Sequence, residues 1–393
     1  MVSLKKAFLL LLALCLFCSC GTPEEADTSL LLDDQFDTAE FLPEYDFLNE
    51  FGKWRQLYES GAAYYLFSDT NPFLHYYDKE SGISGILCGK PECNHSDTSC
   101  NAYLAGGSSL MYYDGYIYWV QQGNTLMRMK PDGTERETVQ YLQGGIANSV
   151  WLHRGYIYSI QTTSSVVDGV SQNLIQLTQE VLGDAEQDAK TVLEVVGNDY
   201  FYQVVGNTVY VGIEAYTLAE DSSIASSSIS LYAYDSASGS LDKLAENTLA
   251  QNYLICDMRF TNGNLFFSAY GDDSQPSLLY QYCTDTKEIA LFSELDSSLI
   301  FYLGDTYIGG IDGRYNVPIC FQDYQGNLLR EEPLITDASL SIDVWGVTPI
   351  LLTDKMLLFL TDVDPEGLPT LFYEIPLDPS EPIQSLLTLE KLL

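Results

Sequence analysis

Short runs of alternating apolar and polar residues, separated by turn residues, recur along most of the chain. In one unit an aromatic and aliphatic run lies on each side of Asp114-Gly115, and a second pair of runs surrounds Asp132-Gly133. Alternation with a period of two predicts β-strands, and a two-residue Asp-Gly turn between such runs predicts a hairpin. The unit therefore predicts four short antiparallel strands in succession.

The same unit recurs along the chain at spacings of about 40 to 57 residues. Its first hairpin turn falls at Gly61, Gly115, Gly155, Gly206, Gly263, Gly304 and Asp354. Its second hairpin spans 74–83, 126–134, 174–192, 231–241, 279–289, 319–328 and 371–383. Repeated four-stranded units are typical of β-propeller blades, whereas a β-sandwich has no reason to repeat a paired hairpin. We therefore expect an all-β fold, a β-propeller of seven four-stranded blades.

The N-terminus does not share this pattern. Lys5-Lys6 is followed by an apolar run that ends at Phe17, and this run is too short to span a bilayer. A basic start followed by a short apolar run predicts a secretory signal peptide, here residues 1–19.

An acidic stretch over 20–51 separates the signal peptide from the repeats, which occupy 52–393. Its first half is predicted to be a flexible tether, which self-repulsion would extend. The more aromatic stretch 45–58 is expected to pack onto the propeller as a short helix.

The end of the apolar run resembles the lipobox of bacterial lipoproteins. Leu16-Phe17 lies upstream of Ser19-Cys20-Gly21, although Phe17 stands where the motif usually has Leu. The resemblance implies that Cys20 is acylated and becomes the mature N-terminus, which would anchor an extracytoplasmic protein to the membrane by lipid. Cleavage elsewhere and free secretion is the alternative.

The second repeat resembles the YWTD repeat of low-density-lipoprotein-receptor-type propellers. The resemblance rests on residues 115–119 and 126–139, and Val120 and Gln121 stand where the motif has Thr and Asp. Such propellers usually have six blades. The whole chain, with its lipobox and tether, is more similar to β-propeller lipoproteins of Gram-positive anaerobes. That group implies surface anchoring and extracellular recognition, and carries no assigned activity.

The net charge of −37 limits the choice of partner. Nucleic acid requires a cationic footprint, and the sequence has no basic stripe to provide one. Anionic membrane surfaces are disfavoured for the same reason. We therefore expect a protein or glycan ligand, with contact to the membrane only through the lipid.

One dense group of reactive residues lies between the first and second repeats. Cys88, Cys93, His95 and Cys100 fall within a single connection. Thiolate and imidazole are the usual ligands of structural zinc, which makes zinc the cofactor that this set suits. Outside the cytoplasm a disulfide is the competing interpretation, and it would leave one of the three thiols over. Free thiols are the third interpretation, and no catalytic role is assigned.

The other candidates are interpreted as structural. His75 and His153 are expected to be hydrogen-bonded structural histidines, and Cys256, Cys283 and Cys320 to be core residues inside strands. Residues 362–367 resemble the opening of a calcium loop, but Tyr373 stands where the bidentate Glu belongs. Motifs for nucleophilic, phosphate or dinucleotide chemistry are absent from the sequence.

The long connections suggest where the propeller would act. Together with the cysteine-rich connection, inserts at 162–173, 216–228, 270–277 and 362–369 would form one rim. We expect the protein to bind a macromolecule or glycan through this rim as a binding or scaffold module. The alternative is a propeller-type glycoside hydrolase or lyase acting on an external polysaccharide, for which paired acids would be needed.

Overall fold

The computed structural model describes residues 41–42, 44–49, 57–68, 71–104, 106–167, 170–219, 224–261, 263–271, 275–284, 286–295, 299–311, 319–332, 347–352, 354–360 and 371–388. The chain divides into Met1–Phe36 and Asp37–Leu393, and all described residues belong to the second unit. The predicted signal peptide and Cys20 therefore lie outside the described residues.

The second unit is a β-propeller of seven four-stranded antiparallel sheets. Blades 1 to 4 consist of β1 (Leu57–Glu59), β2 (Ala63–Ser68), β3 (Asn71–Asp78), β4 (Ser84–Ile86), β5 (Gly107–Tyr113), β6 (Tyr116–Gln121), β7 (Thr125–Met129), β8 (Glu137–Tyr141), β9 (Ser149–His153), β10 (Tyr156–Val167), β11 (Val170–Val181), β12 (Lys190–Gly197), β13 (Asp199–Val205), β14 (Thr208–Leu218), β15 (Ile224–Asp235) and β16 (Leu241–Thr248). Blades 5 to 7 consist of β17 (Leu254–Thr261), β18 (Asn264–Tyr270), β19 (Ser277–Cys283), β20 (Glu288–Leu295), β21 (Ile300–Leu303), β22 (Tyr307–Ile311), β23 (Ile319–Asp323), β24 (Leu328–Glu332), β25 (Val347–Leu351), β26 (Lys355–Leu360), β27 (Leu371–Pro376) and β28 (Gln384–Thr388).

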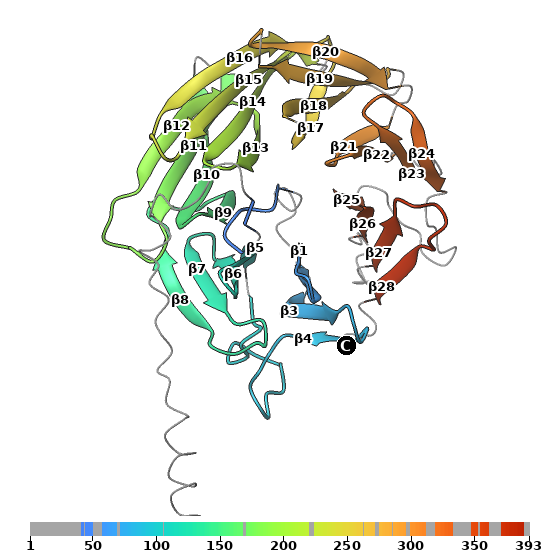
Figure 1. Ribbon diagram of the computed structural model, residues 1–393. Coiled ribbons are helices and arrows are strands. Elements are labelled where there is room, and N and C mark those ends of the chain that lie inside the picture. The colour runs from blue at the N-terminus through green and yellow to red at the C-terminus, as the bar shows by residue number, and fades with distance from the viewer. Residues whose placement is uncertain are drawn as a thin grey trace, which may run out of the picture. The chain divides into compact units, whose positions relative to one another are not determined.

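Each blade is built from consecutive strands, with its first strand innermost in the ring and its fourth at the perimeter (Figure 1). The predicted fold class is confirmed. All seven predicted first-hairpin turns fall between the first and second strands of a blade. The innermost strand of blade 1, which the sequence shows only weakly, is the three-residue strand β1.

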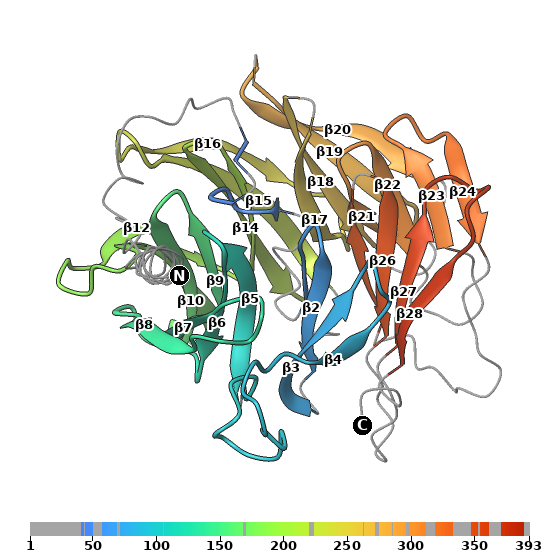
Figure 2. The same ribbon diagram turned by 60° about the horizontal axis from the view of Figure 1, so that its bottom comes forward.

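The ring closes between blade 7 and blade 1 through side chains, because neither blade borrows a strand from the other. Figure 2 shows β2–β4 beside β26–β28. Lys355 Nζ lies 3.3 Å from a Glu59 carboxylate oxygen and 3.1 Å from Glu374, and the Tyr64 hydroxyl donates to Glu374 at 2.7 Å. We call these four residues the closing cluster. Leu357 and neighbouring apolar side chains continue the contact into the core of blade 1.

Residues 44–49 pack against the inner side of the ring, as predicted for the aromatic stretch, and lie close to β9 and β13 (Figure 1). We call them the N-terminal segment. Their described residues begin with a turn, and the downstream end of the predicted helix is strand β1. The prediction of a helix is therefore wrong at 45–48 and at 57–58, where packing on the ring and pairing with β2 outweigh local propensity. Asn49 has 3₁₀ conformation, and residues 50–56 of the predicted helix lie outside the described residues. The predicted flexible tether concerns residues before 41, outside the described residues.

A buried ion pair fixes the N-terminal segment. Asp46 accepts hydrogen bonds from Arg154 Nε at 2.6 Å and Nη2 at 3.0 Å, and both side chains are at most 5% exposed. Phe47 packs 6.0 Å from the Trp151 ring and 5.9 Å from the Tyr202 ring, measured between centroids. Charge pairing and aromatic packing together hold this segment to blades 3 and 4.

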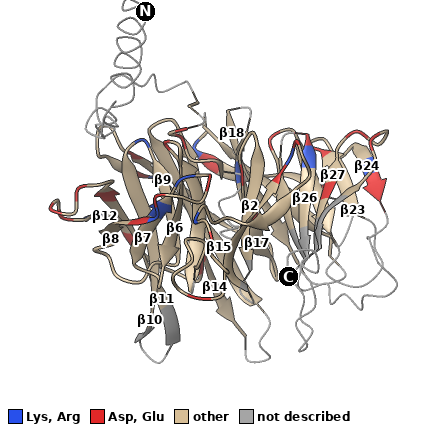
Figure 3. Ribbon diagram, turned by 90° about the horizontal axis from the view of Figure 1, so that it is seen from below, with Lys and Arg blue, Asp and Glu red and all other residues tan. Residues whose placement is uncertain are grey.

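Charged side chains of the described residues lie mostly in turns and at strand ends, with uncharged strands between them (Figure 3). Within the part of the chain that the structure covers, no helix has the length and hydropathy needed to cross a bilayer.

Candidate functional site

The connection from β4 to β5 carries the cysteine and histidine group, and it contacts both blades that it joins. We call residues 88–104 the cluster segment. Leu104 N–H donates to the carbonyl of Pro72 at 2.6 Å, which fixes the end of the cluster segment beside β3 of blade 1. Gly89 N–H donates to the carbonyl of Gly133 at 3.0 Å, in the outer turn of blade 2. A Cβ on Gly133 would lie 2.6 Å from Gly89 N, so the close approach requires glycine there.

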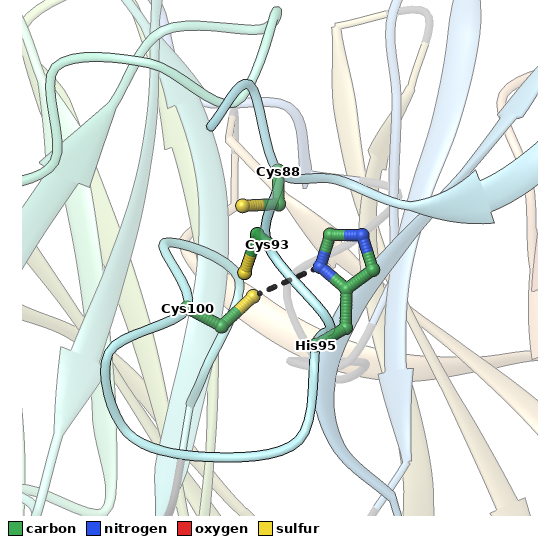
Figure 4. A group of neighbouring side chains, drawn as sticks. All are labelled: Cys88, Cys93, His95 and Cys100. Atoms are coloured by element: carbon green, nitrogen blue, oxygen red, sulfur yellow. Dashed lines mark hydrogen bonds between the residues drawn. The ribbon is translucent and has the colours of Figure 1, made fainter. Parts of the chain in front are cut away.

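The four predicted side chains converge in space. The ligand atoms of Cys88, Cys93, His95 and Cys100 all lie within 4.8 Å of one another. Figure 4 shows the three sulfur atoms and the imidazole turned toward a common centre, with His95 Nδ1 3.3 Å from Cys100 Sγ. His95 adopts a left-handed backbone conformation, with φ of 51°, which turns its side chain back toward the cysteines. The sequence spacing placed these residues in one loop, and the structure brings their ligand atoms together.

The surroundings shift the pKa values of two of the thiols in opposite directions. Burial opposes ionisation of Cys88, but the N–H groups of Lys90 and Asn101, with the neighbouring thiols, hold the pKa of Cys88 below its ordinary value. Burial, together with the neighbouring sulfurs, raises the pKa of Cys100 to about 12, although the N–H of Ala102 opposes this shift. A thiolate is therefore favoured at Cys88 over Cys100, and negative charge at Cys88 opposes a second thiolate at Cys100. A bound cation would remove that opposition.

The donor set determines which metal the cluster could hold. Three thiolates and one imidazole are soft ligands that suit tetrahedral zinc. The remaining described cysteines do not join the cluster, since Cys256 lies on β17, Cys283 on β19 and Cys320 on β23. Cys320 is buried, as expected for a core residue. Cys256 instead lines the central cavity, which corrects the expectation of core packing for this residue.

The two remaining histidines are buried in different surroundings. His153 accepts the Phe47 N–H at Nδ1 (3.0 Å) and donates from Nε2 to the Gly206 carbonyl at 2.6 Å, which confirms a hydrogen-bonded structural role. Neither ring nitrogen of His75 has a hydrogen-bond partner among the described residues, so the expected hydrogen bonding is wrong for this histidine. Burial lowers the pKa of both to about 4. Both are therefore neutral at pH 7 and ill-suited to general acid-base work.

A cavity of about 390 Å³ lies in the central channel. It is bounded by innermost strands of blades 3 to 7 and by Asn49 of the N-terminal segment. The Asn49 amide pairs with the backbone of Val204 on β13, at 2.9 Å and 2.8 Å. The polar and aromatic residues that line the cavity include Ser149, Asp199, Tyr200, Tyr202, Gln203, Asp257, Arg259 and Tyr302.

Two of the charged groups that line the cavity, Arg259 and Asp257, are held by neighbouring residues. Arg259 Nη2 lies 2.6 Å from Asp305, and one Asp257 oxygen accepts the Leu303 N–H at 2.9 Å. Burial raises the pKa of Tyr302 well above its ordinary value, which keeps its hydroxyl protonated. The cavity thus offers aromatic faces and hydrogen-bonding groups, and its one cation is already paired.

Sequence reasoning did not identify the cavity. Its lining comes from the first strand of several repeats, such as residues 199–203 on β13 and 255–259 on β17. Comparing these positions between repeats is the signal that could have found it. Among the described residues, the only group of at least three acidic, histidine or cysteine side chains placed to hold a metal is the cluster at Cys88.

Two of the predicted rim inserts are regular structure. Strands β10 and β11 pair without interruption to Val167 and Val170, and β14 and β15 pair out to Leu218 and Ile224. The expectation of loops there is wrong, because threonine and valine at 162–167 favour extended chain and the paired strands satisfy each other's backbone groups. The insert at 362–369 lies outside the described residues.

No family model and no curated protein matches the chain. It is similar to the solved structure of an oligogalacturonate lyase in complex with manganese, with a TM-score of 0.54 and 13% identity, over 86% of this chain and 89% of that one. A second oligogalacturonate lyase, from Vibrio parahaemolyticus, matches with a TM-score of 0.50 and 10% identity, over 88% of this chain and 93% of that one.

A prolyl endopeptidase structure matches with a TM-score of 0.50 and 12% identity, over 92% of this chain and 52% of that one. Likeness at these identities shows the shared propeller fold, and the fold alone does not assign an activity.

Proposed function

We propose that the protein is a lipid-anchored extracytoplasmic binding module, which captures a glycan through the central cavity and the rim hairpins of blades 3 and 4. The observation that supports this function most directly is the cavity of about 390 Å³, with its aromatic and hydrogen-bonding lining. Sugars present apolar ring faces and hydroxyl groups, and such a lining complements both.

The charges of the protein favour an uncharged glycan. The net charge of −37 repels a polyanion at long range. Within the cavity Arg259 is engaged by Asp305, whereas Asp199 is exposed and able to accept hydrogen bonds from hydroxyl groups. An acidic sugar would meet like charge without an unpaired cation to offset it.

The rim beside the cavity offers further uncharged donors and acceptors. Ser164 donates to Asn173 at 2.9 Å across the β10–β11 hairpin, and the Thr217 and Ser226 hydroxyls lie 2.7 Å apart across β14–β15. These four side chains are at least partly exposed, and each hydroxyl or amide retains capacity for another hydrogen bond. They form a polar wall suited to a hydroxyl-rich ligand.

An array of neutral and acidic oligosaccharides tests the proposal. We expect neutral glycans to bind, and Tyr200→Ala to weaken binding at least tenfold through loss of a cavity-lining ring. Tyr141→Ala is the matched control, because Tyr141 is an exposed tyrosine on the outer strand β8, at 67% exposure. Equal loss in both variants, or no binding to any glycan, would refute glycan capture and leave a protein partner, to be sought by copurification with envelope proteins.

The second candidate is a lyase acting on an external polysaccharide. It is favoured by the likeness to oligogalacturonate lyases over most of the chain. Incubation with oligogalacturonate and manganese tests it, because β-elimination produces an unsaturated sugar with new ultraviolet absorbance. Turnover that is lost in Asp257→Asn and retained in Asp242→Asn, an exposed acid on β16, would replace binding with catalysis.

Anchoring is tested separately at Cys20. Metabolic labelling with a fatty acid should modify the wild-type chain, and Cys20→Ser should abolish the label and release the protein from membranes. Cys18→Ser, which changes a neighbouring cysteine just after the apolar run, should keep the label. Labelling that survives in Cys20→Ser would refute the assignment.

A further inference from the structure

We propose that Cys88, Cys93, His95 and Cys100 bind one Zn²⁺ ion, which fixes the connection between blades 1 and 2. The site is structural, because four protein donors complete a tetrahedral shell and leave no position for substrate. The proposal is independent of which ligand the cavity takes.

The arrangement of donors favours a metal over a disulfide. All four ligand atoms lie within 4.8 Å of one another, whereas a disulfide would use two sulfurs and leave the third thiol beside the imidazole. His95 Nδ1, 3.3 Å from Cys100 Sγ, belongs to the same group of atoms and would have no part in a disulfide.

The surroundings also balance the charge of the proposed complex. Three thiolates around Zn²⁺ carry one net negative charge, and Arg136 lies beside them, with Nη1 donating to the Cys100 carbonyl at 3.0 Å. The same guanidinium is 5.5 Å from the centre of the Trp119 ring and donates to Gln121, so blade 2 holds the cation in place. One fixed positive charge against one net negative charge is what a partly buried zinc site needs.

The position of the cluster gives the metal a mechanical role. Between β4 and β5 the cluster segment has no strand of its own, apart from one isolated bridge between Tyr103 and Phe73. Zinc would tie the start of this segment to its end, while Gly89 contacts blade 2 and Leu104 contacts blade 1. The ion would therefore hold the joint between two neighbouring blades.

Metal content of the full chain, purified in detergent without chelator or reductant, tests the proposal. We expect native mass spectrometry and elemental analysis to find about one zinc per chain. Cys93→Ser should reduce this to near zero. Cys283→Ser, a cysteine at the end of β19 outside the cluster, should retain it. Zinc retained in Cys93→Ser would overturn the site.

Measurements on the wild-type chain keep the test valid if Cys93→Ser misfolds. Replacement of zinc by Co²⁺ should give visible absorption bands of tetrahedral thiolate coordination. Chelation should expose three alkylatable thiols that are protected before it, and lower the unfolding temperature. Loss of two hydrogens from the mass without bound metal would show a disulfide. Three thiols that alkylate without chelator, with no metal present, would equally overturn the proposal.

Discussion

The buried pair of Asp46 and Arg154 attaches the N-terminal segment to the ring, and Asp46→Asn tests how strongly. The carboxylate accepts two Arg154 hydrogen bonds, at 2.6 Å and 3.0 Å, and the Leu42 N–H at 2.9 Å. Replacing it with an amide of the same shape leaves a guanidinium that is 5% exposed without its counter-charge. Breaking a buried pair from one side costs about 3 to 5 kcal/mol.

The segment can avoid the full cost by detaching. Detachment would return Arg154 to water and sacrifice the Phe47 contacts with Trp151 and Tyr202, together with the Asn49 pairing to β13. The observed loss of stability is therefore the smaller of two quantities, the cost of the unpaired charge and the cost of local detachment. We expect a loss of about 3 kcal/mol in urea unfolding, or a smaller loss accompanied by local opening.

Two assays together separate these outcomes. Urea unfolding followed by tryptophan fluorescence measures global stability, and limited proteolysis measures exposure of residues 41–49. The control Asp242→Asn changes an exposed acid on β16 and should stay within about 0.5 kcal/mol of wild type. If Asp46→Asn matches this control in stability and in protease pattern, the ion pair does not hold the segment and the reasoning is refuted.

Three further changes probe other parts of the ring. Burial lowers the pKa of His75 to about 4, so between about pH 6.5 and pH 4 the unfolded chain binds a proton that the folded chain does not. The free energy of unfolding therefore falls as the pH decreases through this range. His75→Leu should remove about 3 kcal/mol of that fall in urea titrations, and an unchanged pH slope would contradict this. Gly133→Ala should destabilise the protein by about 1 to 3 kcal/mol more than Gly326→Ala. Both glycines have positive φ, but only a Cβ added at Gly133 would collide with backbone atoms. Equal urea midpoints for the two variants would refute the close approach. Lys355→Met removes the cation paired with Glu374 in the closing cluster, which then keeps only the Tyr64 hydroxyl, while Glu59 keeps Lys79. It should cost about 2 kcal/mol, whereas exposed Lys243→Met should cost under about 1 kcal/mol. Calorimetry showing equal losses would refute closure by these charges.

The repeat pattern determined the fold because each blade is a local object. Turns such as Asp114-Gly115 and Gly155 lie between short runs of strand-forming residues, and strand pairing within a blade involves neighbours in sequence. The extended β10–β11 hairpin escaped prediction because serine and threonine are as typical of exposed loops as of edge positions in a sheet.

The cysteine cluster could be predicted from the sequence only in part. Cys88, Cys93, His95 and Cys100 were identifiable because they share one connection, and their residue types indicate soft-metal or disulfide chemistry. The N–H groups directed at Cys88 and Cys100, and the nearby Arg136, could not be read from spacing. They depend on how the segment packs on blade 2, which also requires glycine at position 133.

By itself, the sequence determined the number of blades, the order of strands and the residues of the cluster, because these follow from patterns within one repeat or one connection. Only the tertiary structure decided the contents of the channel, the burial of Asp46 against Arg154, and the contacts that close the ring at Lys355 and Glu374. Those features join residues from different repeats, and closure of the ring sets their distances. Local alternation carries no information about which side chains will meet across a channel, so the proposed ligand site emerged only with the fold.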